Sequence, residues 1–250
     1  MQAPRAILFD VDDTLAESFR PPVPEMIDGL LKLLALRPLA ILSAAGFQRI
    51  EHDFLPRIAN SKDAGRFYVL SDGTSRCNVY RDHRWQELYR VAFTTDERGK
   101  IVSSMKNIVA ETGVELNPAY EPLIVDQEGK VAYALLGLQA SEKDKASWDP
   151  DRTKREKLRE ALQKHIPEFE VVIGGKTTLD VFPKDINKAY GVRWLSKELG
   201  IPPQDMLYIA DAFYPGGNDA VTIPTGIQTR PVSGPSDTLR IINELLKICS

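Results

Sequence analysis

Short apolar runs that alternate with segments of helical period constrain the fold of this 250-residue chain more than any other feature. Residues 5–9, 39–42 and 66–70 predict buried strands. Apolar residues recur at helical spacing over residues 23–34, and a second helix is expected over residues 47–55. This strand–helix–strand–helix–strand order favours a parallel sheet with helices on both faces.

The alternation is interrupted between about residues 80 and 180, where the chain is more charged. Strand-like segments at 122–126 and 130–138, a polar helix at 152–166 and a hairpin at 169–182 predict a separate α+β unit. Alternation then resumes with a helix at 187–200, a strand at 205–211 and an amphipathic helix at 236–248. We therefore expect an α/β core, residues 1–80 and 187–250, with an inserted α+β unit, residues 81–186.

Three carboxylates, Asp10, Asp12 and Asp13, follow the first apolar run directly. Like charges this close repel, and burial adds a further cost unless a cation or a proton offsets it. An EF-hand loop is excluded, because its sixth and twelfth positions would be Leu15 and Pro21 instead of Gly and Glu. A solvated turn that caps the next helix is the alternative. However, the acids lie at the carboxyl end of a strand, where open α/β sheets bind ligands.

A second acidic cluster follows the strand predicted at residues 205–211. Asp211 ends this strand, and Asn218 and Asp219 follow a Pro-Gly-Gly turn. A plain surface turn is the alternative, since all of these residue types form turns. Two acidic strand ends in one parallel sheet nevertheless form a natural site for a hard cation such as Mg²⁺, which prefers oxygen ligands.

Composition excludes several other classes of function. The net charge of −3 and the pI near 5.7 give no sign of a surface for nucleic acid or for anionic lipid. No apolar run approaches the length of a spanning helix, and the first residues lack the pattern of a signal peptide. Cys77 and Cys249 are too few for a disulfide framework. We expect a cytoplasmic protein with no nucleic-acid partner and no membrane association.

With these pieces in order, the chain resembles the haloacid dehalogenase superfamily. The resemblance rests on a D-x-D-x-T motif, a Ser after the second strand, a Lys that opens a later helix and an acidic fourth motif. These match Asp10, Asp12 and Thr14; Ser43; Lys188; and Asp211 to Asp219. The resemblance implies a Rossmann-like parallel-sheet core and makes the insert the large α/β cap of a subfamily that includes sugar-phosphate phosphatases and phosphomannomutases.

The nearer resemblance is to eukaryotic-type phosphomannomutases. Residues 179–192, LDVFPKDINKAYGV, are similar to that family's D-V-F-P-x-G-W-D-K-x-Y-C-L segment, and residues 215–220 and 234–246 also follow its pattern. Asp13 and Ala210 stand where the family has Gly. Two cap arginines with which the mutases grip phosphate correspond to Gln127 and Leu138.

The resemblance implies a role for each matching residue in phosphoryl transfer. Asp10 would be the nucleophile, and Asp12 would protonate the leaving oxygen and then deprotonate the attacking group. Lys188 would neutralise charge on the phosphate and on Asp10, with Lys184 as a rival four residues earlier. The resemblance assigns phosphate binding to Ser43, Ala44, Lys188 and Asn218, and supporting roles to Thr14 and Asp219.

The implied cofactor is Mg²⁺, held by Asp10, by the backbone carbonyl of Asp12 and by Asp211. The implied partner is a small phosphorylated substrate, and the resemblance leaves open a homodimer that forms through the cap.

The motifs leave the acceptor of the phosphoryl group open. Water as acceptor gives a phosphatase, and a sugar-phosphate hydroxyl gives a mutase, whose cap needs cations to hold a distal phosphate. The missing arginines favour a phosphatase that acts on a small phosphorylated metabolite such as a sugar phosphate, with a phosphomannomutase-like mutase as the alternative. A non-catalytic binding protein is the third reading. Basic residues elsewhere in the expected cap could rebuild the cationic clamp: Arg81, Arg84, Lys143 and Arg152.

Overall fold

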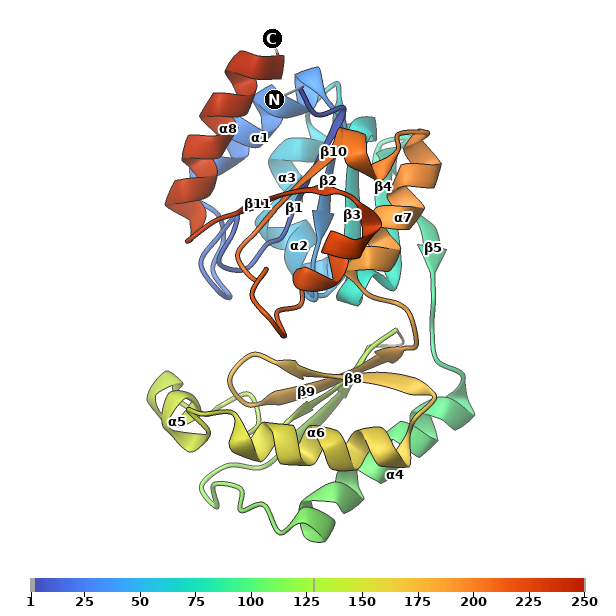
Figure 1. Cartoon of the computed structure of the whole chain (residues 1–250), viewed down its shortest axis with the longest axis vertical. Helices are drawn as coiled ribbons and strands as arrows, with labels where there is room; N and C mark the ends of the chain where they lie inside the picture. Colours follow the sequence, from blue (N-terminus) through green and yellow to red (C-terminus); the bar gives the residue numbers. More distant parts are fainter. Residues whose placement is uncertain (1–2, 128, 250) are drawn as a thin grey trace. The chain divides into compact units, whose positions relative to one another are not determined.

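The computed structural model describes residues 3–127 and 129–249 of the chain. The chain forms two compact units: unit 1 comprises Met1–Arg90 and Ile186–Ser250, and unit 2 comprises Val91–Asp185. Each unit has its own sheet and its own hydrophobic core, so each is described separately (Figure 1). Within the described ranges, no helix combines the length and apolar character needed to cross a membrane.

Unit 1 is built on a seven-stranded sheet with the strand order β11-β10-β1-β2-β3-β4-β5. Five neighbouring strands, from β11 to β3, run parallel, and β4 and β5 add an antiparallel edge. The strand bounds are β1 Ala6–Phe9, β2 Leu39–Leu42, β3 Phe67–Ser71, β4 Arg76–Arg81, β5 Arg84–Arg90, β10 Met206–Ala210 and β11 Gln228–Pro231.

Helices cover both faces of the parallel part of this sheet, which is why β1, β2, β3 and β10 are buried throughout. One core contains Ile7, Phe9 and Ile41 with apolar residues of α1, α2, α3 and α8, and the opposite core contains Leu8 and Leu42 with residues of α7. The helix bounds are α1 Pro24–Leu36, α2 Phe47–Asp53, α3 Leu55–Ala59, α7 Lys188–Leu199 and α8 Pro235–Cys249. Short 3₁₀ segments of unit 1 lie at Ala64–Arg66, Asp72–Thr74, Pro203–Asp205 and Ala220–Thr225.

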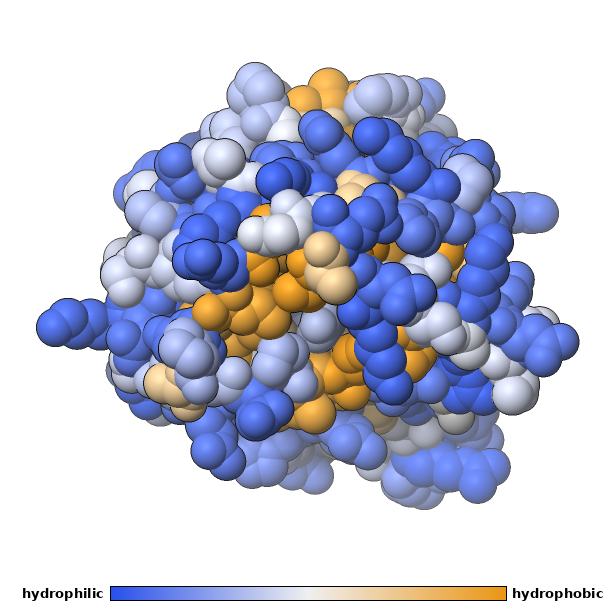
Figure 2. All heavy atoms as spheres, turned by 90° about the horizontal axis from the view of Figure 1, so that it is seen from below, coloured by the Kyte–Doolittle hydropathy of each residue, from blue (hydrophilic) through white to orange (hydrophobic). Residues whose placement is uncertain are grey.

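Unit 2 is a four-stranded antiparallel sheet with the order β6-β7-β9-β8, packed against helices. Its elements are α4 Thr95–Thr112, β6 Leu123–Asp126, β7 Val131–Ala134, α5 Glu142–Trp148, α6 Thr153–His165, β8 Phe169–Gly174 and β9 Thr178–Pro183. Apolar residues of α4 and α6, such as Ile101 and Leu158, share a core with Val131 and Leu179 of the strands. Polar side chains cover most of the outer face near α4, with apolar side chains visible between them (Figure 2).

The predicted fold class is confirmed: a parallel-dominated core sheet with a separate antiparallel unit. The predicted helix over residues 47–55 is two short helices, because Pro56 begins a new turn in α3. The expected boundary at residues 80 and 81 differs from the structure. Residues 81–90 lie in unit 1, because β5 pairs with β4 along its length, and Ile186 also belongs to unit 1.

Candidate functional site

The candidate site lies at the carboxyl ends of the parallel strands of unit 1. Asp10 follows β1, Ser43 follows β2 and Asp211 follows β10. Because β1 lies between β10 and β2, the first residues after these three strands emerge at the same edge of the sheet. This edge is where open parallel sheets bind ligands.

Lys188, the first residue of α7, is the buried cation of the site. Its Nζ donates to Oδ1 of Asp10 at 2.7 Å and to Oδ1 of Asp219 at 2.6 Å. Burial alone would lower the pKa of Lys188, but the carboxylates of Asp10 and Asp219 together raise it. The raised pKa favours a charged ammonium that contacts both carboxylates.

Local features of the chain set the position of Lys188. Asn187 caps α7, because its side-chain oxygen accepts hydrogen bonds from the N–H groups of Ala189 and Tyr190. Thr74 Oγ1 donates to the carbonyl oxygen of Asn187 at 2.7 Å. One turn later, a Cβ at Gly191 would lie 2.9 Å from Cγ2 of Thr74, so the absent side chain permits this close approach of α7. The start of α7 is thus fixed at the sheet edge.

Asp219 is fully buried and accepts a hydrogen bond from the same Nζ of Lys188 as Asp10 does. Its Oδ1 also accepts from the hydroxyl of Tyr208, and its Oδ2 accepts from the N–H of Ala212 at 3.0 Å. The turn that returns the chain from Asp211 to Asp219 requires Gly217, since a Cβ there would collide with the carbonyl oxygen of Ala212. These contacts make Asp219 a support for the cation and the loop.

Asp10 is a buried carboxyl group with a perturbed pKa. Burial raises the pKa of Asp10 to about 7, against the opposing effect of Lys188, and the negative charge of Asp219 adds to the rise. A bound cation would favour the ionised form and so oppose this rise. A cation bound beside Asp10 would therefore favour the ionised carboxylate near neutral pH, which is the form that can act as a nucleophile.

Asp10, Asp211 and Asp219 form an acidic group suited to a metal ion. Each offers one carboxylate oxygen, and these oxygens all lie within 4.8 Å of one another. Burial raises the pKa of Asp211, and the negative charge of Asp219 raises it further. A hard cation would relieve the repulsion between these two carboxylates. Thr14 Oγ1 donates to Oδ1 of Asp211 at 3.4 Å and so contacts the same group. The donor set fits a divalent cation that prefers oxygen ligands.

Asp12 lies in the loop after β1 and its carboxylate faces α2. Arg49 binds both oxygens, with Nη1 2.9 Å from Oδ2 and Nη2 2.7 Å from Oδ1. The N–H of Phe19 donates to Oδ1 at 2.9 Å. The next residue, Asp13, has a φ of 56° and accepts from the N–H and hydroxyl of Ser18, so its carboxylate closes the turn.

The remaining predicted site residues differ in their surroundings. Ser43 is buried; its hydroxyl accepts from the N–H of Ala45 at 3.0 Å, and its carbonyl accepts from Gly73. Ala44 is half-buried beside it, and Asn218 is exposed in the loop before Asp219. Lys184, the rival to Lys188, is exposed and belongs to unit 2.

Two residues of this site, Arg49 and Tyr208, were absent from the sequence-based set. Arg49 lies on a short amphipathic helix and gave no signal, because one arginine on such a helix is most often a solvated side chain. Tyr208 lies inside a buried apolar strand, where an aromatic residue is ordinarily part of the core. Their roles follow only from the contacts with Asp12 and Asp219.

The family model and the curated relatives that match this sequence point to one family. The model of the eukaryotic phosphomannomutase family matches residues 121–248. A probable phosphomannomutase of Caenorhabditis elegans is 24% identical over 251 residues, covering 96% of this chain and 95% of the relative. Phosphomannomutase 2 of Dictyostelium discoideum is 23% identical, covering 95% of this chain and 94% of the relative.

Solved structures share the fold at lower identity. A C-terminally truncated IMP-nucleotidase of Plasmodium falciparum has a TM-score of 0.74 and 17% identity, covering 98% of this chain and 72% of that one. A trehalose-6-phosphate phosphatase of Aspergillus fumigatus has a TM-score of 0.58 and 16% identity, covering 98% of this chain and 93% of that one. At this identity the likeness shows a common fold.

Proposed function

We propose that this chain, which belongs to the eukaryotic phosphomannomutase family, is a Mg²⁺-dependent phosphatase that hydrolyses a small phosphorylated metabolite, with sugar phosphates as the first class to test. The observation that carries the proposal is the buried contact between Lys188 and Asp10 beside the acidic group of Asp10, Asp211 and Asp219. A carboxylate, an ammonium and a site for a hard cation are the parts that phosphoryl transfer to an aspartate requires.

In the first step an oxygen of Asp10 attacks phosphorus and the bond to the leaving oxygen breaks. Asp12 gives its proton to that oxygen, which leaves as an alcohol, and Asp10 carries the phosphoryl group. Lys188 neutralises negative charge on the transferred group, and Asp219 keeps the ammonium in place. Ser43 would donate a hydrogen bond to a phosphoryl oxygen.

In the second step Asp12 takes a proton from water, whose oxygen attacks the phosphorus of phosphorylated Asp10. The bond to Asp10 breaks, inorganic phosphate leaves, and Asp10 and Asp12 return to their starting states. Asp10, Asp211 and the backbone carbonyl of Asp12 would hold Mg²⁺, with Asp219 close to the same group. When bound, the cation stabilises charge on the phosphoryl oxygens and orients them.

The choice of water over a sugar hydroxyl rests on unit 2. Gln127 and Leu138, at the positions matched to the two mutase arginines, are both exposed and uncharged. Of the basic residues expected to rebuild a clamp, Arg81 and Arg84 lie on β4 and β5 of unit 1, whereas Lys143 and Arg152 lie in unit 2. A bisphosphorylated intermediate would lack contacts with the two mutase arginines, whose positions are occupied here by Gln127 and Leu138. This lack favours release of the intermediate from the protein and its hydrolysis.

A phosphomannomutase is the second candidate, because curated relatives of that name align over about 95% of both chains. We would assay hexose 1- and 6-phosphates with Mg²⁺ for free phosphate and for isomerised product, with and without a hexose bisphosphate. The expected result is phosphate release under both conditions, abolished by Asp10→Asn. Efficient isomerisation with little free phosphate would establish the mutase instead.

A further inference from the structure

The contacts of Asp12 point to a residue outside the phosphoryl-transfer set. The side chains of Arg49 and Asp12 are 24% and 30% exposed, and their bidentate contact joins helix α2 to the loop that carries the predicted acid/base group. Bidentate pairs of this kind fix the plane of a carboxylate as well as its position. Arg49 therefore determines the direction in which Asp12 presents its oxygens.

The carboxylate of Asp12 uses most of its hydrogen-bond positions within the protein. A carboxylate has about four lone-pair positions, two on each oxygen. Oδ1 accepts from Arg49 and from the N–H of Phe19, and Oδ2 accepts from Arg49. Among the hydrogen bonds of the described residues, one position on Oδ2 is left. A group that exchanges one proton with a leaving oxygen and then with water needs one such position held in a fixed direction.

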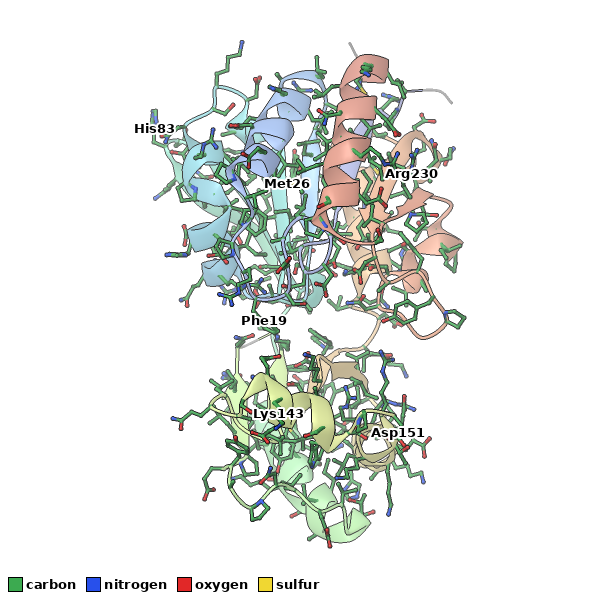
Figure 3. The ribbon with its side chains drawn as sticks, turned by 90° about the vertical axis from the view of Figure 1, so that its left-hand side faces the viewer. Phe19, Met26, His83, Lys143, Asp151 and Arg230 are labelled. Carbon is green, nitrogen blue, oxygen red and sulfur yellow. The ribbon has the colours of Figure 1, made fainter. Side chains whose placement is uncertain are left out.

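Phe19 completes the support of Arg49. The guanidinium carbon lies 5.2 Å from the centroid of the Phe19 ring, within the range of a cation–π contact. Phe19 has a φ of 61° and a side chain that is 79% exposed, both unfavourable for a phenylalanine. Strained residues of this kind concentrate at functional sites. Phe19 lies in the loop between β1 and α1 and is labelled in Figure 3.

A second anchor holds Arg49 on its own helix. Nε of Arg49 lies 3.6 Å from Oδ2 of Asp53, one turn further along α2. The guanidinium is thus oriented by Asp53, by the Phe19 ring and by Asp12 itself. Such an arrangement reduces the rotamers that the arginine can adopt and so ties the carboxylate of Asp12 to α2.

We propose that Arg49 is a positioning residue that orients Asp12 for both proton transfers, with Phe19 as its support. The inference rests on the proposed function, since it assigns Arg49 to the same two steps. Arg49 acts through Asp12 and need not contact the substrate. Its loss should therefore affect the steps that need proton transfer and spare a step that does not.

The test compares Arg49→Met, which keeps the apolar stem, with Arg57→Met. Arg57 on α3 pairs with Asp28, and both of these side chains are about half exposed, so the control removes the same group from a surface pair. The probes are 4-nitrophenyl phosphate, whose leaving group needs no proton, and glycerol 2-phosphate, whose leaving group does. The release of 4-nitrophenol is followed before the steady state, together with phosphorylation of Asp10.

We expect Arg49→Met to reduce steady-state turnover of both probes by about 10- to 100-fold. This loss is smaller than the full contribution of acid–base catalysis, because Asp12 itself is still present. The first release of 4-nitrophenol should change less than about threefold, so a burst appears and phosphorylated Asp10 accumulates. Arg49→Lys, which can donate to one oxygen, should recover part of the rate. Arg57→Met should behave as the wild type.

Phe19→Ala provides a second variant for which loss of the fold is not expected, since the ring is exposed. It should show the same burst with a smaller loss of turnover. Equal slowing of both steps in these variants, or turnover equal to that of Arg57→Met, overturns the role of Arg49 while the proposed function stands. A wild type inactive on both probes and on sugar phosphates overturns the proposed function, and this role with it.

Discussion

At the scale of single residues, Asp180 is a buried carboxyl group that the proposed chemistry does not use. It lies on β9 in unit 2, and burial raises its pKa. Its Oδ1 has no hydrogen-bond partner among the described residues, and a Cβ on Gly174 would collide with its Oδ2. The surroundings of Asp180 therefore leave room for its side chain but disfavour the ionised form of its carboxyl group.

This burial predicts a dependence of stability on pH. The folded state retains a proton on Asp180 that the unfolded chain releases near pH 4, so the contribution of Asp180 to stability is complete below that pH. It is lost as pH rises through the higher pKa of the folded state. Asp180→Asn should unfold at a higher temperature than the wild type at pH 7 and at nearly the same temperature at pH 4.

Thermal unfolding of both proteins from pH 4 to pH 7 measures this difference, with Glu170→Gln on the neighbouring strand as the control. The expected gain at pH 7 is about 1–3 kcal/mol, the usual cost of a buried polar group without a partner. A difference that stays constant over the whole range would show that Asp180 does not titrate there.

Residue types that are costly to bury were the most predictable part of the site. Asp10 and Asp211 could be selected from sequence as acids that directly follow buried strands, and Lys188 could be selected from the resemblance to the family's motif. The structure brings these three together with Asp219. Arg49 could not be selected, since its contact with Asp12 depends on how α2 packs beside the loop after β1.

At the scale of elements, the start of α7 links helix capping to the site. Asn187→Ala removes two hydrogen bonds to backbone N–H groups and should cost about 1 kcal/mol of stability. Because Lys188 is the residue directly after Asn187, loss of the cap should also displace Lys188. Turnover should therefore fall by more than the smaller amount of folded protein explains. Asn187→Asp keeps the cap and should retain most of the activity.

The control for this prediction is Thr94→Ala at the capping box of α4, where Thr94 and Glu97 exchange hydrogen bonds in unit 2. It should cost a similar free energy of unfolding with unchanged kcat. Urea unfolding and steady-state kinetics on the same preparations separate the two effects. Equal kcat in the two alanine variants would mean that the cap of α7 does not position Lys188.

Elements with strong periodicity or uninterrupted apolar runs were predicted, and those with mixed patterns were not. The pair β4 and β5 was missed, because Arg76, Arg81, Arg84 and Arg90 at the strand ends made the segment resemble a polar loop. The sequence predicts β3, but it does not show that β4 pairs with β3 and that β5 pairs with β4. Helix α4 carries Ile101, Met105 and Ile108 at helical spacing and a capping box, so its signal was present but weak against its many polar residues.

At the scale of the whole molecule, a cation that binds the folded acidic group should stabilise unit 1. A ligand that binds only the folded state adds RT ln(1 + [L]/Kd), about 2.7 kcal/mol at a hundredfold excess over Kd. Mg²⁺ should therefore raise the unfolding temperature of unit 1 and leave that of unit 2 unchanged. Asp211→Asn should shift this response to higher Mg²⁺ concentrations.

Differential scanning calorimetry over a Mg²⁺ series, with NaCl at matched ionic strength, tests this linkage without any substrate. A wild type whose unfolding is insensitive to Mg²⁺ would count against a magnesium site in the acidic group. An equal response in Asp211→Asn would instead remove Asp211 from the ligands.

The insertion of unit 2 between two segments of unit 1 also governs the order in which the protein can assemble during synthesis. Asp10 and Lys188 are 178 residues apart, and β1 pairs with β10, which is made near the end of the chain. Unit 2 is continuous from Val91 to Asp185, so it can fold on the ribosome while β1 still lacks a neighbour. The apolar strands of the first 90 residues then wait with one edge open, a state prone to aggregation, until β10 emerges. A nascent chain arrested before β10 should therefore carry a protease-resistant unit 2 and a protease-sensitive N-terminal segment.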